Sequence, residues 1–232
     1  EVLYTGMSNS GVYKSIDGGD TWLPKQKGMV DSHIVSILID PTDSGVVYAL
    51  AVPGGAYKTD DGGENWSLAS NGLATSGGYG GNLMIMDPQD PNHLLSLIGG
   101  RLYESKNGAI SWVQRAPGCL LTAWSIAINP VDSLEIAAVH SAMDANNPCG
   151  NGVLLSLDGG QTWTNMGLEK ADYFSTIKFL PITGNVLFVD PSGELYRSDD
   201  HGNTWDKVSN EKLDGFIIDQ SDEQRVYGTN YG

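Results

Sequence analysis

Short apolar segments separated by turn residues run along the whole chain. Runs such as HIVSILIDP, VVYALAV, GAYKT and NWSLAS are rich in β-branched and aromatic residues, and Gly, Pro, Asp and Asn stand between them. Segments of this length and composition are typical of β-strands joined by tight turns. The pattern therefore predicts an all-β fold.

The strand pattern is built on a repeat. An eight-residue segment, here called the box, occurs as SIDGGDTW (15–22), TDDGGENW (59–66), SKNGAISW (105–112), SLDGGQTW (156–163) and SDDHGNTW (198–205). A period in the forties with about four predicted strands in each unit is typical of the blades of a β-propeller. We expect about five blades in one propeller domain or a portion of one, with boundaries near 1–31, 32–78, 79–121, 122–171, 172–211 and 212–232.

The turns fix the order of strands within a unit. Strand A ends at Asp40-Pro41 and at the matching positions of the other units, strand B follows as VVYAL, and strand C as GAYKT. Strand D opens on the tryptophan of the box. The box is therefore predicted to form the hairpin between strands C and D.

The chemistry of the box suits a hairpin. Its Asp accepts hydrogen bonds from the amides of its own turn, its Ser or Thr serves the same turn, and its Gly takes a positive φ. Each tryptophan is expected to pack between neighbouring sheets. The third box has Asn107 and Ala109 in place of Asp and Gly, so we expect it to be the least regular. The residues with this structural role are Asp17, Trp22, Asp61, Trp66, Asn107, Trp112, Asp158, Trp163, Asp200 and Trp205.

The pattern S-x-D-x-G-x-T-W on a strand-turn-strand resembles the Asp-box, or BNR repeat. This repeat occurs in sialidases, xyloglucanase-type glycoside hydrolases, sortilin-type receptors and photosystem II assembly factors. The resemblance covers essentially the whole chain and implies a propeller of four-stranded antiparallel blades. Families that share the box differ in activity, so it does not imply a function.

The two ends of the chain read as the same part of a blade. Residues 1–6 resemble a strand B, and residues 226–230 resemble another. We therefore expect a piece of a longer array rather than a five-bladed ring.

Candidate contact residues are sought at the top face, the side where strand A begins, since propeller ligands usually cluster there. Long loops are predicted at 69–81, 115–122, 140–152 and 165–173. Aromatic rings stack on sugars or on partner side chains, and carboxylates or histidines fix orientation. The candidates are Trp124, Tyr173, His140, Asp144, Asp172, Tyr79, His33 and Arg115. For Trp124 and Tyr173 the alternative is that the ring plugs the central channel or packs between blades.

Charge narrows the classes of partner. The chain has a net charge of −15, from 28 acidic and 13 basic residues, and no long apolar run. Nucleic acid and membrane insertion are therefore poor expectations, because both need features that this chain lacks. No cofactor and no metal site are expected, because the histidines have no metal-ligand spacing. The acidic turns DPTDSG, DPQDPN and DQSDEQ are interpreted as solvated turns, with weak calcium binding as the alternative.

Cys119 and Cys149 both fall in predicted loops of the fourth unit. They form either a disulfide, which we favour, or two separate thiols. A disulfide would indicate an extracellular or periplasmic location.

Two functions remain open. We favour a non-catalytic module that binds a protein or polysaccharide. The alternative is a fragment of a secreted glycoside hydrolase of the xyloglucanase type, whose carboxylates lie partly outside this chain. The three substrate-binding arginines of sialidases do not converge here, because Arg197 and Arg225 fall near the opposite turns.

Overall fold

The structure is a computed structural model that describes residues 1–8, 10–31, 33–76, 81–115, 123–140, 150–168, 174–191, 193–209, 211–213 and 215–229. The regular structure of these residues consists of β-strands. Within the same ranges, no helix is long and apolar enough to cross a membrane.

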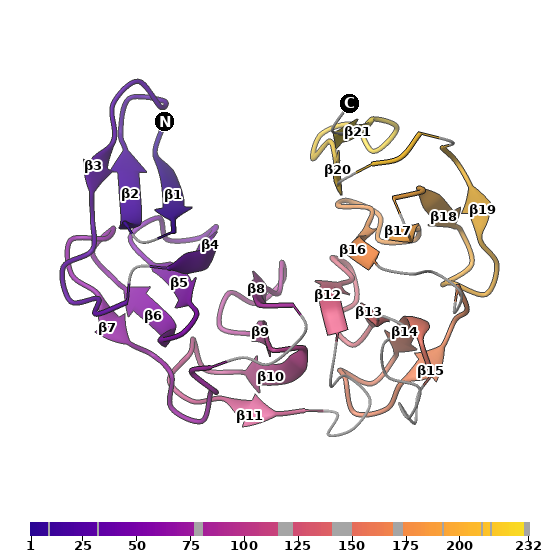
Figure 1. The fold of residues 1–232 in the computed structure, drawn as a ribbon, viewed down its shortest axis with the longest axis horizontal. Coiled ribbons are helices and arrows are strands. Elements are labelled where there is room, and N and C mark those ends of the chain that lie inside the picture. The colour runs from indigo at the N-terminus through magenta and orange to yellow at the C-terminus, as the bar shows by residue number, and fades with distance from the viewer. Residues whose placement is uncertain are drawn as a thin grey trace. The chain divides into compact units, whose positions relative to one another are not determined.

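The strands form six antiparallel sheets, numbered here in chain order (Figure 1). The first sheet contains β1 (Leu3–Met7), β2 (Gly11–Ser15) and β3 (Leu23–Pro24). The second contains β4 (Ile34–Ile39), β5 (Val47–Ala51), β6 (Gly55–Thr59) and β7 (Ser67–Leu68). The third contains β8 (Leu83–Met86), β9 (Leu94–Ile98), β10 (Arg101–Ser105) and β11 (Val113–Gln114).

The later sheets follow the same plan. The fourth contains β12 (Ala123–Ile128), β13 (Ile136–His140), β14 (Gly152–Ser156) and β15 (Thr164–Asn165). The fifth contains β16 (Phe174–Phe179), β17 (Leu187–Pro191), β18 (Tyr196–Ser198) and β19 (Asp206–Lys207). The sixth contains β20 (Gly215–Ile218) and β21 (Val226–Thr229). In each sheet the strands lie side by side in chain order, as the predicted A-B-C-D order requires.

The chain divides into two compact units. The first comprises Glu1–Met86, Asp90–Gly99 and Tyr103–Gln114, and the second comprises Asp87–Gln89, Gly100–Leu102 and Arg115–Gly232. Each unit is described below by itself.

The core of each unit lies between the faces of neighbouring sheets. The second strand of the second sheet, β5, is buried along its whole length, whereas the last strand, β7, is exposed. Tyr48, Leu50 and Met84 share one cluster of the first unit, and Val153, Ile177 and Val189 share one of the second. Burial of a side chain of this size stabilises the fold by roughly 1.5–3 kcal/mol. The sheets are therefore held together by their central strands.

Two tryptophans of the first unit tie their box to the sheet before it. The Trp66 amide donates to the Lys27 carbonyl (2.8 Å), and its indole Nε1–H donates to the Lys25 carbonyl (2.9 Å). Trp112 repeats this arrangement on Asn71 (2.8 Å) and Ala69 (2.8 Å). Both rings are buried. These tryptophans therefore form the predicted contact between sheets.

The expectation of a buried tryptophan in every box is wrong for Trp22. Its side chain is 38% exposed, because no described strand precedes β1 to cover it. Its indole donates to Gly19 of its own box (3.0 Å). Trp163 is half-buried and donates to Gly160 of its own box (3.1 Å), while the half-buried Trp205 reaches Met166 of the preceding sheet (2.8 Å). Among the described residues, the ring therefore joins neighbouring sheets in three of the five boxes.

Close packing against the tryptophan backbone requires glycine. Gly72 has a φ of 84°, and a Cβ there would lie 2.1 Å from the Trp112 carbonyl oxygen. Gly167, which follows the fourth box, has a similar φ of 91°, yet no described atom lies within 4 Å of its Cβ position. The two glycines thus share a backbone conformation and differ in steric surroundings.

We predict that Gly72→Ala destabilises the protein more than Gly167→Ala does. Both changes cost about 1 kcal/mol for a left-handed φ, and Gly72→Ala adds roughly 1–3 kcal/mol for the clash. Urea unfolding of the two variants measures the difference. Equal losses would show that the contact between Gly72 and Trp112 is not tight.

Candidate binding site

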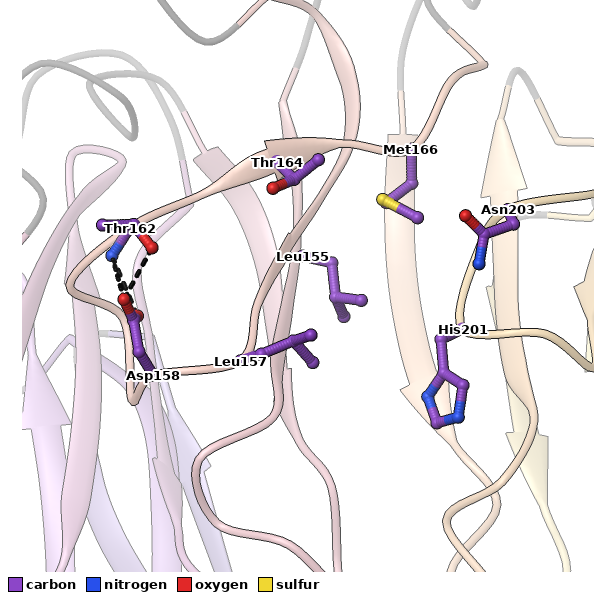
Figure 2. Close-up of a pocket in the computed structure, with 8 residues that line it drawn as sticks. All are labelled: Leu155, Leu157, Asp158, Thr162, Thr164, Met166, His201 and Asn203. Carbon is purple, nitrogen blue, oxygen red and sulfur yellow. Dashed lines mark hydrogen bonds between the residues drawn. The ribbon is translucent and has the colours of Figure 1, made fainter.

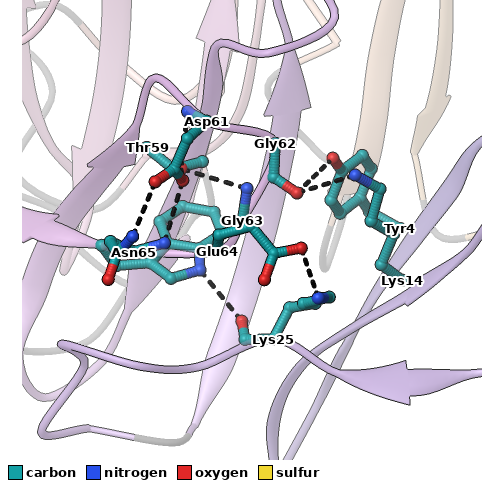
Figure 3. A network of polar contacts seen from close by, with 10 residues as sticks. Tyr4, Lys14, Lys25, Thr59, Asp61, Gly62, Gly63, Glu64 and Asn65 are labelled. Carbon is teal, nitrogen blue, oxygen red and sulfur yellow. Dashed lines mark hydrogen bonds and ion pairs between the residues drawn. The ribbon is translucent and has the colours of Figure 1, made fainter.

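The five boxes form the predicted hairpins between the last two strands of the first five sheets. In the second box, the Thr59 hydroxyl donates to Asp61 Oδ1 (2.7 Å) and accepts the Gly63 amide (3.0 Å). Asp61 also accepts the Asn65 amide (2.9 Å) and the Asn65 side-chain nitrogen (2.7 Å), as Figure 3 shows. The first, fourth and fifth boxes repeat these contacts with Asp17, Asp158 and Asp200.

The expectation that the third box is the least regular is wrong. Asn107 Oδ1 accepts the Ser105 hydroxyl (3.0 Å) and the Ser111 amide (3.0 Å). Its Nδ2 donates to the Ser111 hydroxyl (2.9 Å), where a carboxylate would accept instead. Ala109 adopts a φ of 65°, which is also positive, as for the glycines at the equivalent position of the other boxes. Asparagine preserves the turn because the hydroxyl partner can reverse its hydrogen bond.

The acidic turns between the first and second strands are hydrogen-bonded in a similar way. Asp40 Oδ1 accepts the Thr42 amide (2.7 Å), and Asp219 Oδ1 accepts the Ser221 amide (2.8 Å). The box is joined to this turn, since the Gly62 amide donates to the Gly45 carbonyl (2.8 Å). No group of three metal-ligating side chains occurs in the part of the chain that the structure describes.

Trp124 is the most prominent of the predicted contact residues. It lies in β12 at a β-bulge between Ala123 and Ser125, and its side chain is 39% exposed. Val35 occupies the corresponding bulge of β4 and is 37% exposed. A bulge leaves one residue unpaired and re-aims its side chain. The local backbone therefore holds Trp124 outward.

The other candidates are scattered. His33 is exposed just before β4, and Arg115 is half-buried with its amide donating to the Leu102 carbonyl (2.8 Å). His140 was expected in a loop, but it is the last residue of β13 and is completely buried, because strand pairing with Ala123 and Gly152 extends to this position. Tyr79, Asp144, Asp172, Tyr173 and the two cysteines, Cys119 and Cys149, lie outside the described residues.

A pocket of about 390 Å³ lies within the second unit, between the fourth and fifth sheets. Figure 2 shows Leu155, Leu157 and Met166 on the side of the fourth sheet and His201 and Asn203 on the side of the fifth. Asp158, Thr162 and Thr164 complete its lining. The pocket is thus apolar in its middle and polar at its rim.

His201 links the two sheets beside this pocket. It stands where the other boxes have glycine, and it has a φ of 56°. Its Nδ1 lies 2.6 Å from Oε1 of the buried Glu135, which Asn129 also contacts. This histidine therefore replaces the glycine of the other boxes and adds a side-chain hydrogen bond to the preceding sheet.

Hydrogen bonds from the box keep its carboxylates ionised. The Asn65 side chain, together with the Asn65 amide, lowers the pKa of Asp61 to about 2. The Thr162 hydroxyl and amide lower the pKa of Asp158 to about 2 in the same way. The pocket rim consequently carries a negative charge at neutral pH.

Comparison with known proteins identifies the fold. No protein-family model and no curated protein sequence matches the chain. An ancestral GH74 enzyme superposes with a TM-score of 0.74 at 16% identity, over 96% of this chain and 32% of the enzyme. YCF48 bound to a D1 peptide gives a TM-score of 0.68 at 15% identity, over 97% of this chain and 70% of YCF48.

A GH74 enzyme of Niastella koreensis gives a TM-score of 0.67 at 18% identity, over 86% of this chain and 35% of the enzyme. These structures are β-propellers. The chain therefore has the β-propeller fold. It spans about a third of the length of the two GH74 enzymes, and at these identities the similarity shows the fold alone.

In propeller terms, the six sheets are blades and the pocket lies at the junction of the fourth and fifth blades. The prediction of contact residues missed this pocket, because it considered only the top face. Two differences between copies of the repeat could have indicated the pocket. The fifth box alone has histidine directly after its Asp, and the residue three places after the box tryptophan is Met166 in the fourth unit but Lys25 in the first.

We predict that Asp158→Asn removes a pH-dependent part of the stability. A carboxylate whose pKa is depressed on folding stabilises the folded state above its ordinary pKa, and this stabilisation is lost as the pH falls through the folded value. The Tm difference between native chain and variant should therefore be constant above about pH 5 and shrink between about pH 4 and 2.

Asn107→Asp is the matched control, because it introduces the carboxylate into the box that lacks one. As the pH is raised from about 2 to about 4, the Tm of this variant should rise relative to that of the native chain. A Tm difference for Asp158→Asn that does not change between pH 6 and 2 would contradict the prediction.

Proposed function

We propose that the chain is a binding module that recognises a protein or a polysaccharide, with Trp124 in its contact surface. The supporting observation is a large aromatic ring held outward by an ordered strand. An exposed tryptophan offers a rigid apolar face and one N–H donor, which suits both sugar stacking and protein contacts.

The backbone around Trp124 is fixed on both sides. The Ala123 amide donates to the Gly100 carbonyl (3.4 Å), and the Ser125 hydroxyl accepts the Ile177 amide (3.4 Å) from the next blade. Ser36, beside Val35, likewise donates to the Met84 carbonyl (3.1 Å) of its neighbouring blade. A ring on such a support loses little conformational freedom when it binds.

The comparisons agree with a binding role without specifying the ligand. YCF48 holds a D1 peptide on a propeller that shares the fold over most of both chains. The same blade architecture can therefore present a surface to a peptide. A binding screen is needed to identify the ligand of this chain.

We predict that Trp124→Ala weakens binding by about thirtyfold, since an aromatic anchor contributes about 2 kcal/mol or more to an interface. A glycan array and affinity capture with the native chain identify the ligand, and titration calorimetry compares the variants. Val35→Ala is the matched control, because it truncates the equivalent bulge residue. Equal affinity of Trp124→Ala and native chain would place the contact surface elsewhere.

A fragment of a glycoside hydrolase is the second candidate, since the ancestral GH74 enzyme superposes on 96% of this chain. Such chemistry needs two carboxylates about 5–10 Å apart across a cleft. Asp190, a carboxylate of β17, is fully buried and accepts the Thr176 amide (2.6 Å). Release of reducing sugar from xyloglucan by the native chain would favour the hydrolase.

We also propose an extracellular or periplasmic location, which depends on a Cys119–Cys149 disulfide. Intact mass measured with and without reductant should differ by two hydrogens, and alkylation should label both cysteines only after reduction. Labelling of both thiols in the purified, unreduced protein would contradict the disulfide and the location inferred from it.

A further inference from the structure

At the junction between the first and second blades, side chains of the protein itself fill the space beside the second box. Lys14 Nζ donates to the Gly62 carbonyl (2.8 Å), which also accepts the Tyr4 hydroxyl (2.9 Å). Lys25 forms an ion pair with Glu64. Figure 3 shows both lysine side chains reaching from the first blade to the second box. Their aliphatic stems occupy the space, and their ammonium groups meet oxygen atoms of the box.

The same positions differ at the junction of the fourth and fifth blades. Strand pairing places Ala137 opposite Leu155, as it places Tyr4 opposite Lys14. Met166 corresponds to Lys25, because both lie three residues after the box tryptophan. The Met166 amide donates to the Val153 carbonyl and the Lys25 amide to the Val12 carbonyl, each in the strand that precedes the box. Each long or charged side chain is thus replaced by a shorter or uncharged one. The pocket of about 390 Å³ is the space that results.

The lining retains the acceptors that a lysine would need. His201 stands in the position of Gly62, and no hydrogen bond to its carbonyl oxygen occurs among the described residues. Asn203 stands in the position of Glu64 and lines the pocket with its amide. Asp158 adds a carboxylate at the rim, and Glu135 lies behind the His201 ring. A chain with a net charge of −15 further favours a cation.

We propose that this pocket binds a lysine side chain of a partner protein, in the way that the chain's own lysines fill the first junction. The stem of the lysine packs on Leu155, Leu157 and Met166, and its ammonium group donates to the oxygen atoms of the fifth box. Trp124 does not line the pocket. The site is therefore independent of the proposed contact surface at Trp124.

The test uses the peptide acetyl-Gly-Lys-Gly-amide on the full chain, with methyl signals of Met166 and Leu157 followed by NMR. A peptide with norleucine in place of lysine keeps the stem and lacks the charge. We expect both methyl signals to shift with the lysine peptide, and its affinity to exceed that of the norleucine peptide by roughly two- to fivefold, the value of an exposed ion pair.

Two substitutions in the pocket and one control substitution test the proposal further. Asn203→Glu restores the carboxylate found at Glu64 and should tighten binding of the lysine peptide by a further two- to fivefold, with the norleucine peptide unaffected. Met166→Lys restores the residue found at Lys25 and should abolish the shift at Leu157, because the new side chain fills the pocket. Val208→Lys adds the same charge at the equivalent position of the fifth blade and should leave binding intact.

The outcomes separate the alternatives. Equal or tighter binding of the norleucine peptide, or no effect of Asn203→Glu, would overturn the proposal. Asn203 is exposed, so this variant is expected to fold even if Met166→Lys does not. Trp124→Ala should bind the lysine peptide as the native chain does, which keeps a failure here distinct from a failure at the Trp124 surface.

Discussion

The fold depends on the hydrogen bonds that the box side chains make to their own hairpin. Each box forces two consecutive residues to positive φ, for example Gly62 and Gly63 at 68° and 91°. Such a turn leaves backbone amides pointing inward, and a buried amide without a partner is destabilising. The hydroxyl and carboxylate of the box satisfy these amides locally. In the second, third and fifth boxes, the tryptophan that follows is thereby held at a fixed place beside the preceding blade.

Differences between copies of the repeat then create differences between the junctions. Tyr4 and Lys14 fill the first junction, and Ala137 and Leu155 leave space in the fourth. His201 compensates for part of this space by reaching Glu135. A uniform scaffold thus produces one junction where lysine side chains fill the space beside the box and another that contains a pocket there.

Local features of this protein were predictable from the sequence, and features that depend on neighbours were not. The box hairpins follow from side-chain contacts within four residues, so their place and strand order were predicted correctly. The regularity of the third box was missed because asparagine can donate where a carboxylate accepts. The exposure of Trp22 and the burial of His140 depend on which strands lie beside them. The pocket depends on five positions in two blades, which are Ala137, Leu155 and Met166 in the fourth and His201 and Asn203 in the fifth.

Different residues of the box hold the hairpin and face the neighbouring blade, and this separation has an evolutionary consequence. The Ser or Thr, the Asp or Asn and the tryptophan hold the hairpin, whereas the residues one and three places after the Asp, such as Gly62 and Glu64 or His201 and Asn203, face the neighbouring blade. Substitutions at these two outward positions leave the hydrogen bonds of the hydroxyl and the carboxylate in place and remove only side-chain contacts such as that of Asn203 Nδ2 with the Asp200 carbonyl (2.6 Å). A lineage can therefore vary the recognition properties of one blade at a time while the hairpin that folds the blade is inherited unchanged.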